Sequence, residues 1–214
     1  MDTIEAIILG IVQGLTEFLP VSSSGHLQIA KALMGVEIEQ NLLFDVTLHA
    51  ATVLSTIVVL WSEVARLLRG LFSRRFNEEQ AYVLKLLLSM IPIGIVGFTL
   101  KDRLDALLES PAILLVVGCM LLVTAVLLAF AYYATPRQKA QLSYRDAFLI
   151  GVAQAVAALP GLSRSGSTIA TGLLLGHRTQ TVAPFSSLLV SAPSLGAPFP
   201  DLLKGPPGTH THGP

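Results

Sequence analysis

Charged residues are scarce in this chain of 214 residues, where Asp, Glu, Lys and Arg together make up 13% of the sequence. A soluble domain averages about 25% charged residues. Hydrophobic residues reach 52%, and the mean hydropathy is +0.67. This composition excludes an ordinary soluble domain and predicts a protein that lies in a lipid bilayer.

Neither sign of charge is in excess, because 14 basic residues balance 14 acidic ones. A long-range field that attracts nucleic acid is therefore not indicated, and we expect no nucleic-acid partner. Cys119 is the only cysteine, which excludes an intrachain disulfide and a cysteine-based zinc site. The N-terminus lacks the basic flank and the cleavage site of a signal peptide, so we expect Met1 to belong to the mature chain.

The chain does contain long apolar segments. A helix needs roughly 20 residues to cross the hydrocarbon core, and three segments meet this length: residues 42–61, 82–100 and 111–133. They predict an all-α integral membrane protein with several transmembrane helices. Residues 4–19 are too short to cross, carry Gln13 and Glu17, and end at Pro20.

A polar turn follows Pro20, and a second short helical pattern then runs to Gly35. Irregular backbone at membrane depth survives only where protein or water surrounds it. Residues 4–35 are therefore predicted to form a re-entrant hairpin, which enters the bilayer and leaves it on the same side.

The chain repeats this pattern further on. When the sequence is aligned with itself at one constant offset, polar and glycine positions of two segments coincide. The pairs are Gly10 with Gly151, Gln13 with Gln154, Ser22 with Ser163, Ser24 with Ser165 and Gly25 with Gly166. A second re-entrant hairpin is thus predicted at residues 144–176. A hairpin makes no net crossing and three spans follow the first one, so the second copy has inverted topology. Each hairpin has a break, which is the polar turn between its two short helices, and the two breaks would then meet near the middle of the bilayer.

The second copy is shorter than the first. The first repeat covers residues 1–140, whereas the second has only residues 141–204, followed by a tail at residues 205–214 that is predicted to be disordered. Two expected spans are missing, and the candidate span at residues 181–203 contains four prolines, each of which costs about 3 kcal/mol or more inside a helix. We therefore expect a C-terminally truncated or altered copy of a longer protein, whose second hairpin is poorly enclosed.

Basic residues indicate the orientation. Residues 66–75 hold four arginines and residues 137–145 hold three basic residues, whereas the loop between them holds only Lys101 and Arg103. The positive-inside rule places the two basic loops in the cytoplasm. The first hairpin is then predicted to enter from the outer face.

Polar residues gather at both breaks. Gln13 and Glu17 lie four residues apart and so share one helix face before the first break. The run Ser22–His26 adds hydroxyls, a glycine and an imidazole, and residues 163–168 add Arg164, whose guanidinium fork suits two phosphate oxygens. Helix starts bind anions, so two facing breaks suit a pyrophosphate. The carboxylate beside them can hold a divalent cation.

Each of these residues also has a purely structural interpretation. Ser22, Ser163 and Ser165 could be simple helix caps, and the two glutamines could only hydrogen-bond across helices. Glu17 and Arg164 are harder to explain in this way, because a charge buried in the membrane needs a partner. The coincidence of an acid, serines, a histidine and an arginine in two symmetry-related breaks favours a binding site.

The run QGLTEFLPVSSSGH at residues 13–26 and the run PGLSRSGST at residues 160–168 resemble the undecaprenyl-pyrophosphate phosphatase family, also called the bacitracin-resistance family. The likeness extends from about residue 4 to about residue 176. It implies a metal-dependent hydrolase of the bacterial plasma membrane that converts undecaprenyl pyrophosphate to undecaprenyl phosphate and inorganic phosphate. Such an enzyme recycles the lipid carrier of cell-wall synthesis and confers bacitracin resistance, and its active site opens to the outer side.

The resemblance also implies roles for single residues. The family's nucleophilic serine falls on Ser23, its histidine on His26 and its essential arginine on Arg164, while its first motif falls on Gln13 and Glu17. The residues expected to bind the substrate are Ser22, Ser24, Gly25, Ser163, Ser165, Gly166 and Thr168.

The hypothesis that follows places Mg²⁺ or Ca²⁺ near Glu17 and Gln13, where it neutralises the diphosphate, while Arg164 stabilises charge on the attacked phosphoryl group. In one route Ser23 attacks with His26 as base. In the other, a metal-activated water attacks and Ser23 only positions phosphate. An inverted-repeat transporter or lipid flippase and an inactive fragment stay as alternatives, and a homodimer is left open.

Overall fold

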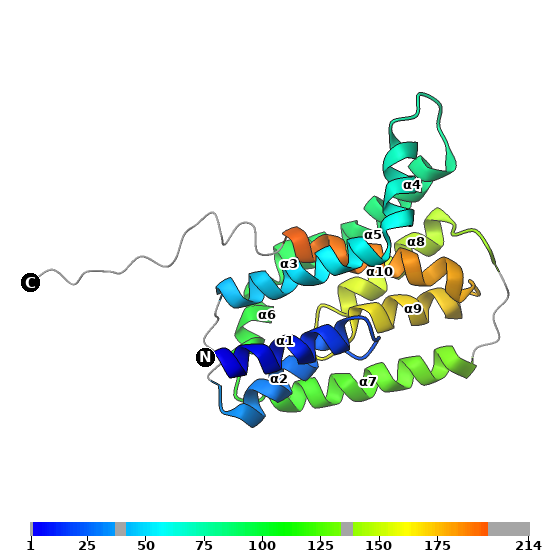
Figure 1. Cartoon of the computed structure of the whole chain (residues 1–214). Coiled ribbons are helices and arrows are strands. Elements are labelled where there is room, and N and C mark those ends of the chain that lie inside the picture. Colours follow the sequence, from blue (N-terminus) through cyan, green and yellow to red (C-terminus); the bar gives the residue numbers. More distant parts are fainter. Residues whose placement is uncertain (1, 37–41, 134–138, 197–214) are drawn as a thin grey trace, which may run out of the picture.

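The computed structural model describes residues 2–36, 42–133 and 139–196, and these residues fold almost entirely into helices (Figure 1). An isolated bridge between Lys139 and His177 is the only β-type pairing in these ranges. The helices are α1 Thr3–Glu17, α2 Ser23–Met34, α3 Leu42–Val59, α4 Trp61–Leu71, α5 Glu78–Thr99, α6 Lys101–Leu108, α7 Ile113–Tyr133, α8 Tyr144–Val156, α9 Arg164–Leu174 and α10 Thr179–Gly196.

Two helices of the described chain, α5 and α7, are long and apolar enough to cross a membrane, and the bent pair of α3 and α4 gives up to three spans. Only 6% of the apolar window of α5 and 17% of that of α7 are buried inside the protein, so a bilayer must cover their exposed side chains. The segment expected to span at residues 42–61 forms α3, but the chain turns by 83° after Val59 into α4.

Side-chain caps explain where several helices begin. Asp2 and Glu5 form a capping box at the start of α1. Asn77 caps α5 and Ser143 caps α8, each by accepting a hydrogen bond from a backbone N–H three residues later. Such caps satisfy backbone donors that the helix itself cannot, and each contributes about 1 kcal/mol.

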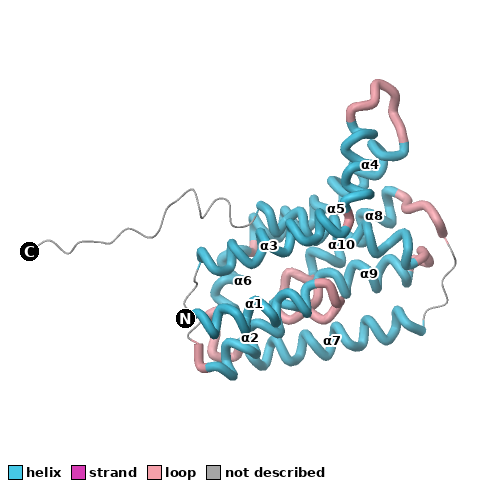
Figure 2. The backbone as a smooth tube through the Cα atoms, in the orientation of Figure 1, coloured by secondary structure: helices cyan, strands magenta, loops and turns pink. Residues whose placement is uncertain are grey.

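Two pairs of short helices form hairpins. α1 packs on α2 around the break at residues 18–22, and α8 packs on α9 around the break at residues 157–163. The hairpins start from opposite ends of the helix bundle, and their breaks lie in its middle (Figure 1). Figure 2 shows the irregular backbone of the second break enclosed between helices rather than at an end of the molecule.

The second hairpin is well enclosed, contrary to the expectation from the short C-terminal segment. α8 packs on α5, and α9 packs on α7 and α10. Ser89 of α5 donates a hydrogen bond to the carbonyl of Ala147 at 2.7 Å, and Gly151 lies so close to Ser89 that a Cβ there would overlap its backbone. The buried core nearby consists of Leu142, Ala147, Ile150, Phe185 and Leu189.

α10 supplies much of this enclosure, although two prolines lie inside it. Each interior proline costs about 3 kcal/mol. Val182, Phe185 and Leu189 on the same helix are all 0% exposed, and each makes many van der Waals contacts with neighbouring helices, which is what holds helices together in a membrane. Packing therefore offsets the prolines, which the sequence alone had counted against a helix. Residues 197–203 of the candidate span and the tail at residues 205–214 lie outside the described residues.

Candidate active site

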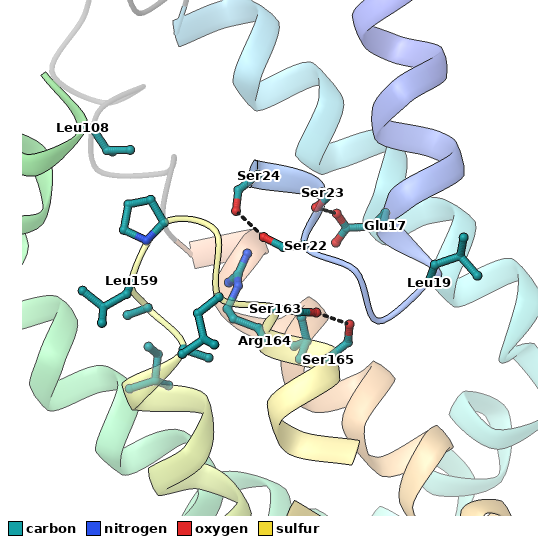
Figure 3. Close-up of a pocket in the computed structure, with 16 residues that line it drawn as sticks. Glu17, Leu19, Ser22, Ser23, Ser24, Leu108, Leu159, Ser163, Arg164 and Ser165 are labelled. Carbon is teal, nitrogen blue, oxygen red and sulfur yellow. Dashed lines mark hydrogen bonds between the residues drawn. The ribbon is translucent and has the colours of Figure 1, made fainter. Parts of the chain in front are cut away.

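A cavity of about 260 Å³ lies between the two breaks, and residues of both hairpins line it (Figure 3). The first hairpin contributes an acid and three serines, and the second contributes an arginine between two serines. These polar lining residues are Glu17, Ser22, Ser23, Ser24, Ser163, Arg164 and Ser165. The cavity therefore combines acceptor, hydroxyl and cationic groups from two segments that are far apart in the sequence.

Glu17 is the last residue of α1, and its carboxylate holds two neighbours in place. Oε2 of Glu17 accepts a hydrogen bond from Nε2 of Gln13 at 2.8 Å. The same oxygen accepts a hydrogen bond from the hydroxyl of Ser23, the first residue of α2. The acid thus orients the Ser23 hydroxyl across the break (Figure 3).

Ser22 caps α2 in an unusual backbone conformation. Its φ of 67° lies in the left-handed region, and no other non-glycine residue of the described ranges has a positive φ. Such a conformation costs of order 1–3 kcal/mol and is common at functional sites. The Ser22 hydroxyl accepts a hydrogen bond from the backbone N–H of Gly25 at 3.3 Å. Ser23 and Ser24, the first two residues of α2, line the cavity, and the start of a helix favours anions.

The start of α9 repeats this arrangement. The Ser163 hydroxyl accepts a hydrogen bond from the backbone N–H of Gly166 at 3.0 Å. The hydroxyls of Ser163 and Ser165 lie 3.3 Å apart, the same separation as those of Ser22 and Ser24. Two helix starts with the same pattern of side-chain capping, on different cap backbones, therefore face one cavity.

Small residues allow the two breaks to touch. A Cβ added at Gly25 would lie 3.2 Å from Cα of Gly161, and one added at Gly166 would lie 2.9 Å from the carbonyl oxygen of Pro20. The offset that aligns the two hairpins relates Gly25 to Gly166 and Pro20 to Gly161, so the two contacts are equivalent. A two-fold relationship between surfaces produces paired contacts of this kind.

The charges of Glu17 and Arg164 lie on opposite sides of the cavity. The carboxylate interacts electrostatically with the guanidinium, but they form no salt bridge within 4 Å in the described part of the chain. The Arg164 side chain extends from the second hairpin toward the serine-rich break of the first (Figure 3). The geometry leaves the guanidinium available to an anion that enters between the hairpins.

Comparison with known proteins decides the family. A family model described as bacitracin resistance protein BacA matches residues 6–211. The chain belongs to the BacA family. The match continues well past residue 176, where the sequence likeness was expected to end, so the C-terminal segment also follows the BacA family.

Several curated relatives carry the name undecaprenyl-diphosphatase. The chain is 60% identical over 204 residues to the one from Parabacteroides distasonis and 58% identical over 204 residues to one from Bacteroides fragilis. Each alignment covers 95% of this chain and 76% of the relative. The one from Methanosphaera stadtmanae is 37% identical over an alignment of 214 positions, gaps included, which covers 92% of this chain and 76% of the relative. The chain thus spans about three quarters of the length of these BacA-family proteins.

The remaining predicted site residues do not line the cavity. Gln13 lies behind Glu17 and is 4% exposed, while Gly166 and Thr168 are buried within α9. Gly25 is buried where the hairpins touch. His26 was expected to act as base on Ser23, but its Nδ1 donates to the carbonyl of Ser22 at 2.8 Å, and the partner of the Ser23 hydroxyl is Glu17.

The residues present fit a divalent cation that arrives with a diphosphate. The described chain contains no group of three or more His, Cys, Asp and Glu residues that could hold a metal alone. However, both hydrogen bonds to Glu17 end on Oε2, which leaves Oε1 for another ligand. Oε1 of Gln13 is buried without a hydrogen-bond partner. Mg²⁺ commonly uses one or two protein oxygens together with substrate phosphates.

Two supporting residues escaped the sequence analysis. Thr124 of α7 accepts a hydrogen bond from the backbone N–H of Ser163 at 3.1 Å. The hydroxyls of Ser186 of α10 and Thr168 lie 2.5 Å apart, and both residues are 0% exposed. A lone polar residue in an apolar helix was a usable signal for Thr124. Ser186 had no such signal, because several serines lie near it in the sequence.

Proposed function

We propose that this chain is an undecaprenyl-diphosphatase, which hydrolyses undecaprenyl pyrophosphate to undecaprenyl phosphate and inorganic phosphate. The observation that carries the proposal is the shared cavity, in which the hydrogen-bonded pair of Glu17 and Ser23 faces Arg164. Membership of the BacA family and 60% identity over 95% of the chain to a protein named undecaprenyl-diphosphatase support it.

The proposed fold is an inverted-topology repeat with two re-entrant hairpins. Its first unit covers residues 1–140 and its second, incomplete unit residues 141–204. Three features support it: matching helix caps at Ser22 and Ser163, paired contacts between the breaks, and hairpins that start from opposite ends of the bundle. With the basic loops in the cytoplasm, the first hairpin and the active site open to the outer side of the bacterial inner membrane.

Substrate binding is assigned to the two helix starts. The terminal phosphate lies between Ser23 and Arg164, whose guanidinium binds two phosphate oxygens. Backbone N–H groups of the first turns of α2 and α9 bind further oxygens, together with the hydroxyls of Ser24, Ser163 and Ser165. These donors are already in place before the substrate arrives, so they can stabilise charge that grows on the attacked phosphoryl group.

Ser23 is the proposed nucleophile. Its Oγ attacks the terminal phosphorus while its proton passes to Oε2 of Glu17, which already accepts the hydrogen bond from this hydroxyl. The bond from phosphorus to the bridging oxygen breaks, and undecaprenyl phosphate leaves with the bonding electrons. Glu17 then gives the proton it took from Ser23 to the departing phosphate group and is a carboxylate again. Water attacks the phosphoserine and passes a proton to Glu17, and Glu17 returns a proton to Oγ of Ser23 as the bond from phosphorus to Oγ breaks and inorganic phosphate leaves.

Glu17 and Gln13 would hold a divalent cation, Mg²⁺ or Ca²⁺, which would offset the negative charge of the diphosphate. In this arrangement Gln13 also fixes the Glu17 carboxylate from behind. His26, held by the Ser22 carbonyl, stabilises the strained turn rather than taking the Ser23 proton.

The test is release of inorganic phosphate from a long-chain isoprenoid diphosphate by the purified protein in detergent. We expect multiple turnovers, and a rapid acid quench with substrate labelled at the terminal phosphorus should leave label on Ser23. Label elsewhere, or full activity in Ser23→Ala, would instead support direct attack by water. Absence of phosphate release, with substrate still bound, would contradict hydrolysis and favour a transporter.

A further inference from the structure

α4 has the geometry of a helix that lies on a membrane surface. It is amphipathic, and it turns by 83° from α3, so it projects sideways from the bundle instead of continuing along it (Figure 1). Trp61, Leu68 and Phe72 are 61%, 51% and 84% exposed, and Arg69 is exposed beside them. Exposed aromatic and aliphatic side chains next to arginines are typical of a helix at the headgroup boundary.

A second cavity, of about 300 Å³, lies beneath α4 at this end of the bundle. α5 forms one wall, and the segment at residues 140–142 and the start of α10 form the others. Its lining residues include Arg66, Glu78, Tyr82, Lys85, Gln141 and Thr181. With α4 on the membrane surface, this cavity would lie at the level of the lipid headgroups. None of its residues takes part in the proposed active site.

Two polar groups of this cavity have no hydrogen-bond acceptor or carboxylate partner within the described chain. The Tyr82 hydroxyl is buried without a hydrogen-bond partner, which costs about 1–3 kcal/mol. The Lys85 ammonium has no carboxylate within 4 Å among the described residues and lies 5.3 Å from the centre of the Tyr144 ring. Arg66 differs, because Glu63 and Glu79 each bind it at 2.9 Å. Tyr82 and Lys85 can therefore donate to an external acceptor.

We propose that this cavity binds the headgroup of one bilayer phospholipid that carries both a phosphate and a primary ammonium group. The phosphate accepts hydrogen bonds from Lys85 and Tyr82, and the ammonium group binds the exposed carboxylate of Glu78. Glu78 begins α5 and Lys85 lies seven residues further along it, roughly 10 Å deeper if α5 runs along the membrane normal. The Lys85 side chain leans back toward the start of the helix. This order matches a phospholipid, whose ammonium group lies on the water side of its phosphate.

The test is thermal unfolding of the protein in detergent with short-chain phosphatidylethanolamine, phosphatidylglycerol or phosphatidylcholine. We expect phosphatidylethanolamine alone to raise the midpoint, by roughly 3 °C or more at ten times its dissociation constant. Lys85→Met should abolish this rise, whereas Arg103→Met on α6, at a distant exposed position, should keep it. An equal response to all three lipids, or an unchanged response in Lys85→Met, would overturn the proposal.

Two further variants keep the test decisive if Lys85→Met does not fold. Tyr82→Phe should unfold no lower than the unchanged protein without lipid, since it removes an unpaired hydroxyl, yet it should gain less from phosphatidylethanolamine. Glu78→Gln should bind phosphatidylglycerol and phosphatidylethanolamine equally, because only the carboxylate recognises the ammonium group. If Glu78→Gln kept the full preference for phosphatidylethanolamine, the assignment of the headgroup would be wrong.

Discussion

The two hairpins share a backbone plan but carry different chemistry. Each break ends in a serine cap, and each is followed by a second serine whose hydroxyl lies 3.3 Å from that of the cap. The offset that aligns the hairpins, however, pairs Ser23 with Arg164 and Glu17 with Ala158. One hairpin therefore provides an acid and a hydroxyl, and the other provides a cation. In the proposed mechanism the two helix starts bind the anion in the same way, and the side chains that differ separate attack from binding.

The hairpins also differ in how they are packed. The outer face of α1 exposes Ile7, Ile11 and Leu15, which are 56%, 56% and 67% exposed. The second hairpin is covered by α5, α7 and α10, and Gln154 is 0% exposed. The strained cap occurs only in the first hairpin, at Ser22, whereas the cap of the second, Ser163, has an ordinary extended backbone. The second hairpin is thus the more buried of the two, and the first carries the strained backbone.

The largest effect is expected from Glu17→Gln, which keeps the size of the side chain but removes the proton acceptor of Ser23. Phosphate release should fall by about 10³-fold, within the usual range for loss of a general base. The fall should appear in kcat rather than KM, measured with an isoprenoid diphosphate. Asp102→Asn changes an acid of α6 that does not line the cavity, and it should retain activity. A loss below tenfold in Glu17→Gln would show that both hairpins act only in binding.

Arg164→Ala tests whether the second hairpin acts by binding phosphate. Removing a charged donor from the transition state should lower kcat/KM by roughly 10²-fold to 10³-fold. Arg164→Lys should recover only part of this loss, because an ammonium group cannot bind two oxygens in a fork. Steady-state kinetics of the three proteins measure the effect. Full activity in Arg164→Lys would mean that charge alone, without bidentate geometry, is needed there.

Gly10 and Gly151 occupy equivalent positions and so compare the packing of the hairpins directly. A Cβ at Gly151 would overlap the backbone of Ser89, whereas nothing lies within 4 Å of one at Gly10. Gly151→Ala should therefore destabilise the protein by about 1–3 kcal/mol. Gly10→Ala should be neutral or stabilise it by about 0.4–1 kcal/mol. The thermal unfolding midpoint in detergent measures both, and equal midpoints would refute the difference in packing.

Ser186→Ala should give the smallest effect. It removes the hydroxyl that meets Thr168, whose own hydroxyl donates to the Arg164 carbonyl at 2.9 Å. A misplaced Arg164 should raise KM by roughly threefold to tenfold, because a neutral hydrogen bond contributes about 1 kcal/mol. Ser73→Ala, which removes an exposed hydroxyl between α4 and α5 and outside the cavity, should leave KM unchanged. A lowered unfolding midpoint with normal KM would assign Ser186 to stability alone.

Local patterns predicted much of the site. Polar residues inside short apolar segments indicated Glu17 and Arg164, because a membrane makes such residues costly unless they have a role. The partner of Ser23 was not predictable in this way. Glu17 and His26 are both near it in the sequence, and only the path of the chain through the left-handed Ser22 brings the acid to the hydroxyl. The sequence likewise did not show that α10 is one continuous helix. The energetic cost of a proline depends on residues beside it in the sequence, whereas the packing that offsets this cost depends on residues far from it in the sequence.

The sequence by itself determined that the chain is helical and lies in a membrane, that it carries two broken-helix segments with matching polar positions, and that these resemble one family. Those conclusions depend on composition, spacing and local capping, which neighbouring residues control. Only the tertiary structure decided that Gly25 meets Gly161, that Glu17 and Arg164 line one cavity, and that Thr124 and Ser186 support the second break. These contacts join segments far apart in the chain, and close packing of whole helices selects them.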